Sequence, residues 1–499
     1  MRQQLDLGPI EISYAAALRG VVPRPIGQAF RYVRCGAMDV QEMIGLAASN
    51  PEGEFVFILA NPAEARAAQE RAYAMRLANL AFLGLSLDEL TAAIADRTQT
   101  IAPADYCCID LTGIHDPARH QVALQLAGKL VAPGGLFTVR YAPFAAPGDG
   151  LRFMVSEFAP ELKPEQQLEF LQELKQLGYA ALEGCPAQAT ALAQALAAQQ
   201  PEIFLRDFGA PPSAPPAALT TIAALSPQQF GFVGDAAAAA NYLEMTVPAP
   251  AQDLLYSLRD HLLYEIIKDF AAARAWRTDI WVKQPAELSD NLAKLFGNFF
   301  YGLADSTKPL PPSIPVNGKD IDLTAPVVTA LFDLMRVMPV TIGDFLSHDI
   351  GREFKPTDVV MAVQLLTACG VAAPMRGSFG GMGQADAHYP RLAGQYNQQL
   401  RGVTLEGAEA MLASTVAGRP LRLRLQEALV LQAVDRVGFE ESADALMEEL
   451  LRISGNPAQA RLIFTADTRP APDFAENMIR EICANHMVGW YALGILDAA

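Results

Sequence analysis

Residues 31–55 read RYVRCGAMDVQEMIGLAASNPEGEF, and the spacing of apolar residues in this stretch changes twice. The apolar run Phe30–Val33 predicts a strand, and Val40–Ala48 has its apolar residues at helical spacing. Glu54–Leu59 (EFVFIL) is apolar again and predicts a second strand. A strand, a loop, a helix and a strand in immediate succession are typical of a parallel sheet with helices packed on its faces.

The same alternation continues to residue 141. The further expected elements are helices at Ala63–Arg76 and Ala118–Val131 and strands at Leu80–Leu83, Asp105–Leu111 and Leu136–Tyr141. We therefore predict a doubly wound, Rossmann-like α/β sheet. Ligands of such sheets bind at the carboxyl ends of the strands, so the loop after Val33 is where we expect a ligand site.

The composition limits the classes of partner. The chain has 499 residues, enough for about three to four domains, and its formal net charge is −17. Nucleic acid and anionic membranes attract basic surfaces, so neither is expected as a partner. No apolar run reaches about eighteen residues, and the N-terminus has no export signal, so we expect a soluble cytoplasmic protein. The six cysteines form no C-x-x-C pair, and no metal site is expected.

Three short motifs resemble those of one enzyme family. They are Leu46–Ala48 (LAA), Asn50–Phe55 (NPEGEF) and Val131–Gly135 (VAPGG). They resemble class I methyltransferases that use S-adenosylmethionine, and more narrowly the bacterial protein-lysine methyltransferases with an attached regulatory domain. Phe232–Asp235 and Arg259–Lys283 look like that regulatory domain. The resemblance implies a cofactor-binding loop after the first strand and methyl transfer to protein amines.

The loop after the first strand departs from the family pattern. Members of the family have E-L-G-x-G-x-G where this chain has RCGAMDV at positions 34–40, so Gly36 is the one glycine retained. Met38 and Val40 would place side chains in the path of the cofactor, where glycine lets the backbone approach closely. Arg34 replaces an acid that lies near the cofactor's positive end in the family. The loop therefore argues against S-adenosylmethionine binding.

Two further positions of the implied cofactor site are changed. The family has an acid for the ribose hydroxyls at the end of the second strand, where this chain has Leu59. It often has an acid for the adenine amino group near the end of the third strand, where this chain has Gly84. Loss of the ribose contact alone costs about 2–3 kcal/mol of binding free energy. A pocket that still binds the cofactor would use Gly36, Asp39 and Asn61.

No catalytic residue is predicted. Asp110, at the end of the fourth strand, is either a general base for an amine or, as we prefer, a cap of the following loop. His115 and His120 do not have the spacing of a recognised metal site. Cys107 and Cys108 lie in an apolar strand and are expected to be buried packing residues.

Segments rich in proline or glycine at 209–217, 308–315 and 376–383 divide the chain. The expected domains are a degenerate methyltransferase-like domain at 1–208, a helical regulatory and dimerisation domain at 218–304, a winged-helix-like domain at 318–376, and an α/β or helical domain at 390–499. The third helix of the winged-helix-like domain, Lys355–Cys369, has no basic residue after its first, so we expect protein docking or structural support instead of DNA binding.

The predicted regulatory domain contains a possible interface. A long amphipathic helix is expected over Leu254–Phe270, and Trp276, Arg277 and Trp281 follow it. Tryptophan and arginine are enriched at interfaces, but they also form clusters inside domains, and both interpretations stay open.

Two functions follow from these observations. In the first, the chain has lost S-adenosylmethionine binding and acts as a structural or regulatory subunit, paired with an active methyltransferase or with a second copy of itself. In the second, it remains an S-adenosylmethionine-dependent methyltransferase that acts on protein amines. We favour the first, because the changed residues lie on the binding side, and methyl transfer requires that the cofactor be held in line with its acceptor.

Overall fold

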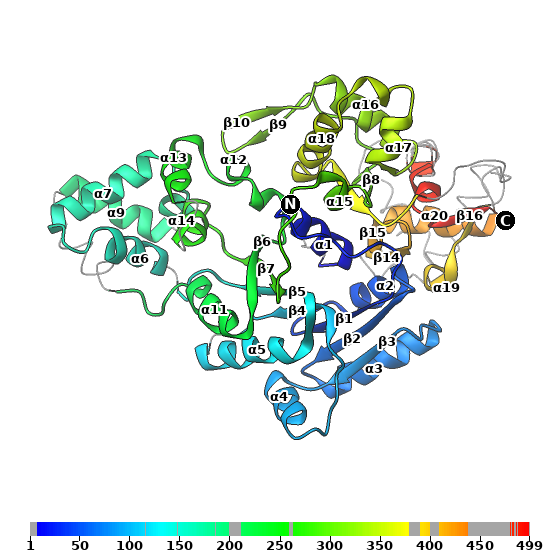
Figure 1. The fold of residues 1–499 in the computed structure, drawn as a ribbon, viewed down its shortest axis with the longest axis horizontal. Coiled ribbons are helices and arrows are strands. Elements are labelled where there is room, and N and C mark those ends of the chain that lie inside the picture. The colour runs from blue at the N-terminus through cyan, green and yellow to red at the C-terminus, as the bar shows by residue number, and fades with distance from the viewer. Residues whose placement is uncertain are drawn as a thin grey trace, which may run out of the picture.

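The computed structural model describes residues 7–498 apart from 115, 147, 185, 199–210, 259–262, 379–389, 400–408, 438–479, 481, 484, 485 and 487 (Figure 1). A central sheet carries helices on both faces, and three smaller units are attached to it. Within the described residues, no helix is long and apolar enough to cross a membrane.

The central sheet has seven strands in the order β3-β2-β1-β4-β5-β7-β6. The strands are β1 Phe30–Cys35, β2 Gly53–Leu59, β3 Leu80–Gly84, β4 Ala104–Asp110, β5 Val131–Tyr141, β6 Phe230–Asp235 and β7 Arg277–Lys283. Neighbours from β3 to β5 pair in parallel, whereas β7 is antiparallel to both β5 and β6. The predicted doubly wound α/β sheet is therefore confirmed.

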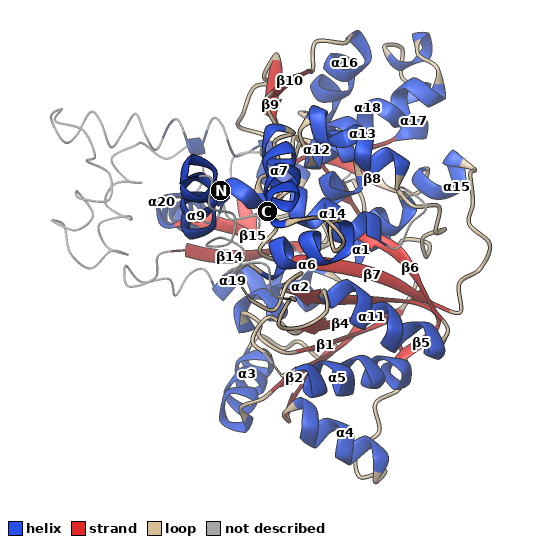
Figure 2. Cartoon of the chain, turned by 90° about the vertical axis from the view of Figure 1, so that its left-hand side faces the viewer, coloured by secondary structure: helices blue, strands red, loops and turns tan. Residues whose placement is uncertain are grey.

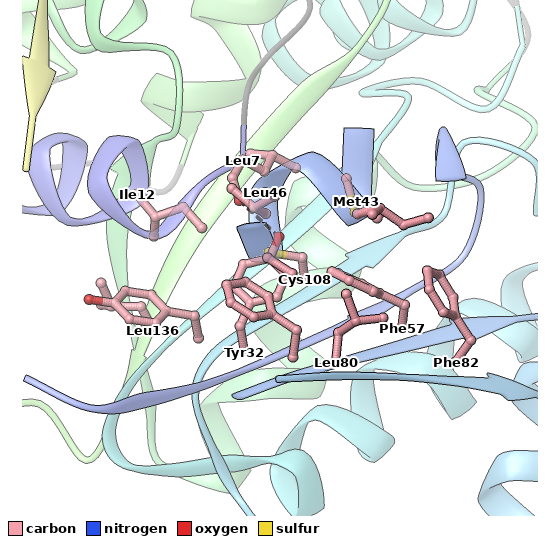
Figure 3. Close-up of a cluster of buried hydrophobic side chains, with 14 of the residues drawn as sticks. Leu7, Ile12, Tyr32, Met43, Leu46, Phe57, Leu80, Phe82, Cys108 and Leu136 are labelled. Atoms are coloured by element: carbon pink, nitrogen blue, oxygen red, sulfur yellow. Dashed lines mark hydrogen bonds between the residues drawn. The ribbon is translucent and has the colours of Figure 1, made fainter. Parts of the chain in front are cut away.

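Helices cover both faces of this sheet (Figure 2). One face carries α1 Pro9–Ala17, α2 Val40–Ser49 and α3 Pro62–Ala74, and the other carries α4 Leu87–Ala95, α5 Pro117–Leu130 and α11 Ala217–Leu225. Figure 3 shows the core of the first face, where Ile12 of α1 and Met43 and Leu46 of α2 pack over Tyr32 and Cys108 of the sheet. The alternation of buried residues along each strand places the two cores on opposite sides.

Strands β6 and β7 lie in the range 218–304, for which the sequence predicted a helical domain. Both belong to the central sheet, since β7 pairs with β5 along its whole length, from Tyr141↔Arg277 to Leu136↔Val282. β7 (RTDIWVK) begins with three polar residues, so its sequence does not show the apolar run that predicts a buried strand. They are buried all the same, because ionic partners surround them.

A helical unit lies between β5 and β7 in the sequence and is interrupted by β6. It contains α6 Asp149–Phe158, α7 Pro164–Gln176, α8 Ala181–Gly184, α9 Pro186–Ala198, η1 Ser226–Gln228, η2 Ala238–Asn241, α12 Leu243–Thr246, α13 Ala249–Ser257 and α14 Leu263–Ala271. The expected single helix Leu254–Phe270 is instead described as two helices, α13 and α14. Residues 259–262 between them lie outside the description, and Leu254, expected on the apolar stripe, is 40% exposed.

The third unit combines helices with a three-stranded antiparallel sheet of order β11-β8-β12. Its elements are α15 Leu292–Phe296, β8 Phe300–Leu303, β9 Ser313–Val316, β10 Lys319–Asp322, α16 Pro326–Met335, β11 Val340–Thr341, α17 Ile342–Ser347, η3 Gly351–Glu353, α18 Pro356–Ala368 and β12 Ala372–Met375. The three helices expected for a winged-helix-like domain correspond to α16, α17 and α18. The proline-rich segment 308–315, predicted as a boundary, leads into the β9–β10 hairpin.

The C-terminal unit packs on α2 of the central domain (Figure 1). It contains β13 Pro390–Leu392, α19 Gly394–Gln398, β14 Glu409–Ser414, β15 Arg419–Arg424, α20 Leu425–Val437 and β16 Leu496–Ala498. Asn50, which follows α2, donates a hydrogen bond of 2.8 Å to the Gly418 carbonyl, and Ser414 N donates to Ser49 Oγ at 3.1 Å. Most of the glycine-rich run at 376–383 lies outside the described residues. So do residues 441–453, which have the sequence pattern of a helix.

Candidate functional site

The loop after β1 passes close to the end of β4. Gly36 has a φ of +105°, and a Cβ built on it would lie 2.7 Å from the carbonyl oxygen of Asp110. Both facts require glycine at this position, because a side chain would be strained and would clash with backbone. The one glycine retained from the expected loop pattern is therefore needed for packing within the chain itself.

Some of the other loop residues pack inward, whereas Ala37 and Asp39 are exposed. Met38 and Val40 are partly buried and pack against the core between the sheet and α2. Arg34 is 9% exposed, and its Nη1 lies 3.5 Å from the sulfur of Met43 on α2. Asp39 caps α2, where its carboxylate accepts hydrogen bonds from the backbone N–H groups of residues 41 and 42 at 2.8 and 3.4 Å. The Asp39 carboxylate thus already satisfies helix N–H groups.

The carboxyl ends of β2 and β3 are closely packed. Leu59 is 4% exposed, belongs to the same core and offers no hydrogen-bond acceptor from its side chain. A Cβ at Gly84 would lie 2.5 Å from the Cα of Pro62, so the start of α3 sits directly against the end of β3. Asn61 caps α3, with its side-chain oxygen 3.0 Å from the N–H of Ala63. Its carbonyl group is therefore also used by a helix terminus.

The first turn of α2 is covered by the C-terminal unit. Nη2 of Arg422 on β15 lies 3.7 Å from Glu42 Oε2 and 4.0 Å from Asp39 Oδ2. Tyr396 on α19 donates a hydrogen bond of 3.3 Å to the carbonyl oxygen of Gln41. The start of the helix that follows the loop is thus held by residues distant in the sequence.

The end of β4 shows a capping arrangement. Asp110 Oδ1 accepts hydrogen bonds from the N–H and the hydroxyl of Thr112, at 2.9 and 2.6 Å. A ring nitrogen of His120 lies 2.6 Å from the Ile114 carbonyl, and His115 lies outside the described residues. In the described part of the chain, no three metal-ligating side chains lie close enough together to hold an ion.

Cys107 and Cys108 are buried in β4, with exposures of 0% and 2%. Burial raises the pKa of both thiols above the ordinary value. A thiol with a raised pKa is a poor nucleophile at neutral pH, which agrees with the packing role predicted for both residues.

A buried ionic cluster lies at the same edge of the sheet, beyond β5. Its members are Tyr141, Asp235, Glu265, Lys268, Asp269, Arg274, Arg277 and Asp279. Arg277 is its centre, with contacts of 2.5 Å to Asp279, 2.9 Å to Asp269 and 3.0 Å to Glu265. Tyr141 donates a hydrogen bond to Asp279 across the β5–β7 pair. The cluster therefore joins residues of four elements, β5, β6, α14 and β7.

The surroundings of the cluster shift the pKa values of its acids in opposite directions. Burial raises the pKa of Asp279 to about 6, although Arg277 opposes this effect. Burial also disfavours the charge of Glu265, but Lys268 and Arg277 outweigh it and lower the pKa of Glu265 to about 2. Burial also raises the pKa of Asp269, so two acids of the cluster are shifted upward while Glu265 stays ionised at neutral pH.

The sequence grouped Trp276, Arg277 and Trp281 as interface residues. Trp276 is 43% exposed, whereas Arg277 and Trp281 are each 1% exposed and packed inside the chain. Arg277 and Trp281 thus form the internal cluster that was the open alternative, and Trp276 alone reaches the surface. The carboxylates around Arg277 are near it in the sequence but lie on two elements, α14 and β7, and their pairing was missed because it depends on how these elements pack. The polar start of an otherwise apolar strand, RTD, was the available signal.

Comparisons with known proteins agree on one group. Residues 214–283 match the family described as "Predicted methyltransferase regulatory domain". The structure is similar to that of PKMT2 from Rickettsia typhi, with a TM-score of 0.57, 13% identity, and coverage of 97% of this chain and 98% of that one. For PKMT2 in complex with AdoHcy, the TM-score is 0.59, the identity 12%, and the coverage 98% of both chains. A search of curated proteins found no match.

Proposed function

We propose that this chain, which has the fold of a class I methyltransferase and carries a methyltransferase regulatory domain, does not bind S-adenosylmethionine and serves as a structural or regulatory subunit. The burial of Leu59 carries this proposal. At the position where the resemblance implies an acid for the ribose hydroxyls, an apolar side chain that is 4% exposed belongs to the core. A ribose placed there would lose its acceptor and have two hydroxyl groups to satisfy elsewhere.

The other implied contacts support the same conclusion. Met38 and Val40 tie the loop to the core, and Gly84 leaves no room between β3 and Pro62 at the implied adenine position. The carboxylate of Asp39 and the amide oxygen of Asn61, the two polar groups expected to serve a retained cofactor, already cap α2 and α3. The residues present do not fit the cofactor, so we derive no methyl-transfer step from this site.

A retained methyltransferase activity is the second candidate. One observation favours it: Gly36 keeps the positive φ that lets a loop approach a cofactor. Incubation of the purified protein with S-adenosylmethionine labelled in its methyl group, together with cellular protein, separates the two candidates. We expect no transfer of label above a control without protein. Label on any protein amine, dependent on this chain, would support the enzyme instead.

The subunit role requires a partner of its own. The exposed Trp276, which follows α14 of the regulatory domain, marks one surface available for such a contact. Affinity purification of the native protein should recover an intact methyltransferase or yield a homodimer of this chain. Recovery of a monomer without any methyltransferase would contradict this part of the proposal.

A further inference from the structure

We propose that a cavity between β6, β7 and α14 is a binding site for a small aromatic carboxylate. The cavity has a volume of about 430 Å³ and is lined by residues that include Arg19, Phe232, Glu265, Lys268, Arg277 and Trp281. We call it the β6–β7 cavity. Its volume lies within the range of small-molecule sites in proteins. It is separate from the loop after β1, so this inference does not depend on whether S-adenosylmethionine binds.

One wall of the cavity is aromatic. The rings of Phe232 and Trp281 pack edge to face, with centroids 5.2 Å apart, and Phe230 lines the same cavity. Phe232 is 37% exposed although it belongs to the central sheet. A partly exposed ring beside a cavity offers a flat apolar surface for a planar group.

Trp281 also carries an unsatisfied donor. Its side chain is 1% exposed and lines the cavity, and its indole N–H has no hydrogen-bond acceptor among the residues described. Buried polar groups are rarely left unpaired in folded proteins. The nitrogen itself is buried, so Trp281 contributes its ring to the cavity wall and not its N–H group.

The interior charges of the cavity are already paired. Glu265 lies 2.7 Å from Lys268 and 3.0 Å from Arg277, and Arg277 lies 2.5 Å from Asp279. The exposures of Lys268, Arg277 and Asp279 are between 1% and 3%. These residues therefore make a rigid polar wall that needs no further counterion.

Arg19 is different, because no carboxylate pairs with it in the described part of the chain. Its Nε donates a hydrogen bond of 3.1 Å to the Val233 carbonyl, and its side-chain stem lies against Gly234 on β6. A Cβ at Gly234 would lie 3.1 Å from Arg19 Cγ, so the glycine makes room for this arginine. Arg19 is exposed and lines the cavity, so its guanidinium is the group that would meet a carboxylate bound there.

Calorimetric titration of the full chain tests the proposal. Phenylacetate and indole-3-acetate provide an aromatic ring and a carboxylate, and phenylacetamide has the same ring as phenylacetate without the charge. We expect saturable binding of both acids, with phenylacetamide at least about tenfold weaker. Trp281→Phe replaces the indole of the aromatic wall by a smaller ring and should weaken both acids several-fold.

Two arginine variants test whether Arg19 binds the carboxylate of the ligand. Arg19→Gln should reduce the affinity for phenylacetate to that for phenylacetamide, about a tenfold loss. Arg66→Gln removes an exposed arginine on α3 and should leave the affinity unchanged. Thermal melting confirms that each variant is folded. If Arg19→Gln or Trp281→Phe fails to fold, the comparison of phenylacetate with phenylacetamide on the unaltered chain still tests whether the cavity recognises a carboxylate.

Three results would overturn the proposal. They are the absence of saturable binding of either acid up to about 1 mM, equal binding of phenylacetate and phenylacetamide, and an undiminished affinity in folded Arg19→Gln. Because none of these titrations contains S-adenosylmethionine, their failure would leave the proposed function untouched.

Discussion

Nη1 of Arg277 lies 2.9 Å from Oδ2 of Asp269, and both side chains are 1% exposed. Arg277 is on β7 of the central sheet and Asp269 is on α14 of the helical unit. The pair therefore joins the helical unit to the central sheet. Because both charges are buried, removing either residue leaves the other without this partner and destabilises the fold.

We predict that Arg277→Met lowers the free energy of unfolding by about 3–5 kcal/mol, because three carboxylates lose the buried guanidinium that they share. Urea denaturation measures this loss. Arg31→Met is the matched control, since Arg31 pairs with Glu54 at the surface and its loss should cost at most about 1 kcal/mol. Equal losses in the two variants would contradict a structural role for the cluster.

The raised pKa of Asp279 predicts a pH dependence of stability. A carboxylic acid whose pKa rises from 3.8 to about 6 on folding stabilises the fold while it is protonated. Its contribution is complete below pH 3.8 and is lost as the pH rises through 6, with a magnitude of up to about 3 kcal/mol.

Asp279→Asn removes that contribution. Relative to the variant, the unaltered protein should therefore become less stable between pH 4 and pH 6, as measured by urea denaturation at a series of pH values. Glu265, with its pKa lowered to about 2, has the opposite sign and acts at lower pH. A stability difference that stays constant from pH 4 to pH 6 would exclude a raised pKa for Asp279.

A third prediction follows from the close contact between β3 and α3. Gly84→Ala would place a methyl group 2.5 Å from the Cα of Pro62, and we expect it to destabilise the chain by about 1–3 kcal/mol. Gly113→Ala is the control, because nothing lies within 4 Å of that position and it should change stability by less than about 0.5 kcal/mol. If Gly84→Ala is as stable as the control, the implied adenine position is more open than we describe.

The sequence predicted the first five strands of the sheet because their apolar runs alternate with helical patterns. It could not predict β7, whose Arg277 and Asp279 look like surface residues until α14 supplies carboxylates to Arg277 and β5 supplies the Tyr141 hydroxyl to Asp279. The substitutions at Leu59 and Gly84 were visible in the sequence. Their packing was not, since the approach of Pro62 to Gly84 depends on where α3 begins. Local sequence patterns thus reveal strands and substituted motif residues. Buried ionic networks can be identified only once the fold is known, because it brings their members together.

Calorimetric titration of the purified chain with S-adenosylmethionine tests the central claim most directly. PKMT2 from Rickettsia typhi, whose structure contains AdoHcy, is the positive control. We expect no saturable heat up to about 1 mM ligand, because Leu59 is packed in the core and the side chains of Asp39 and Asn61 cap helices. A dissociation constant in the micromolar range, together with methyl transfer to a protein, would contradict the proposed loss of the cofactor.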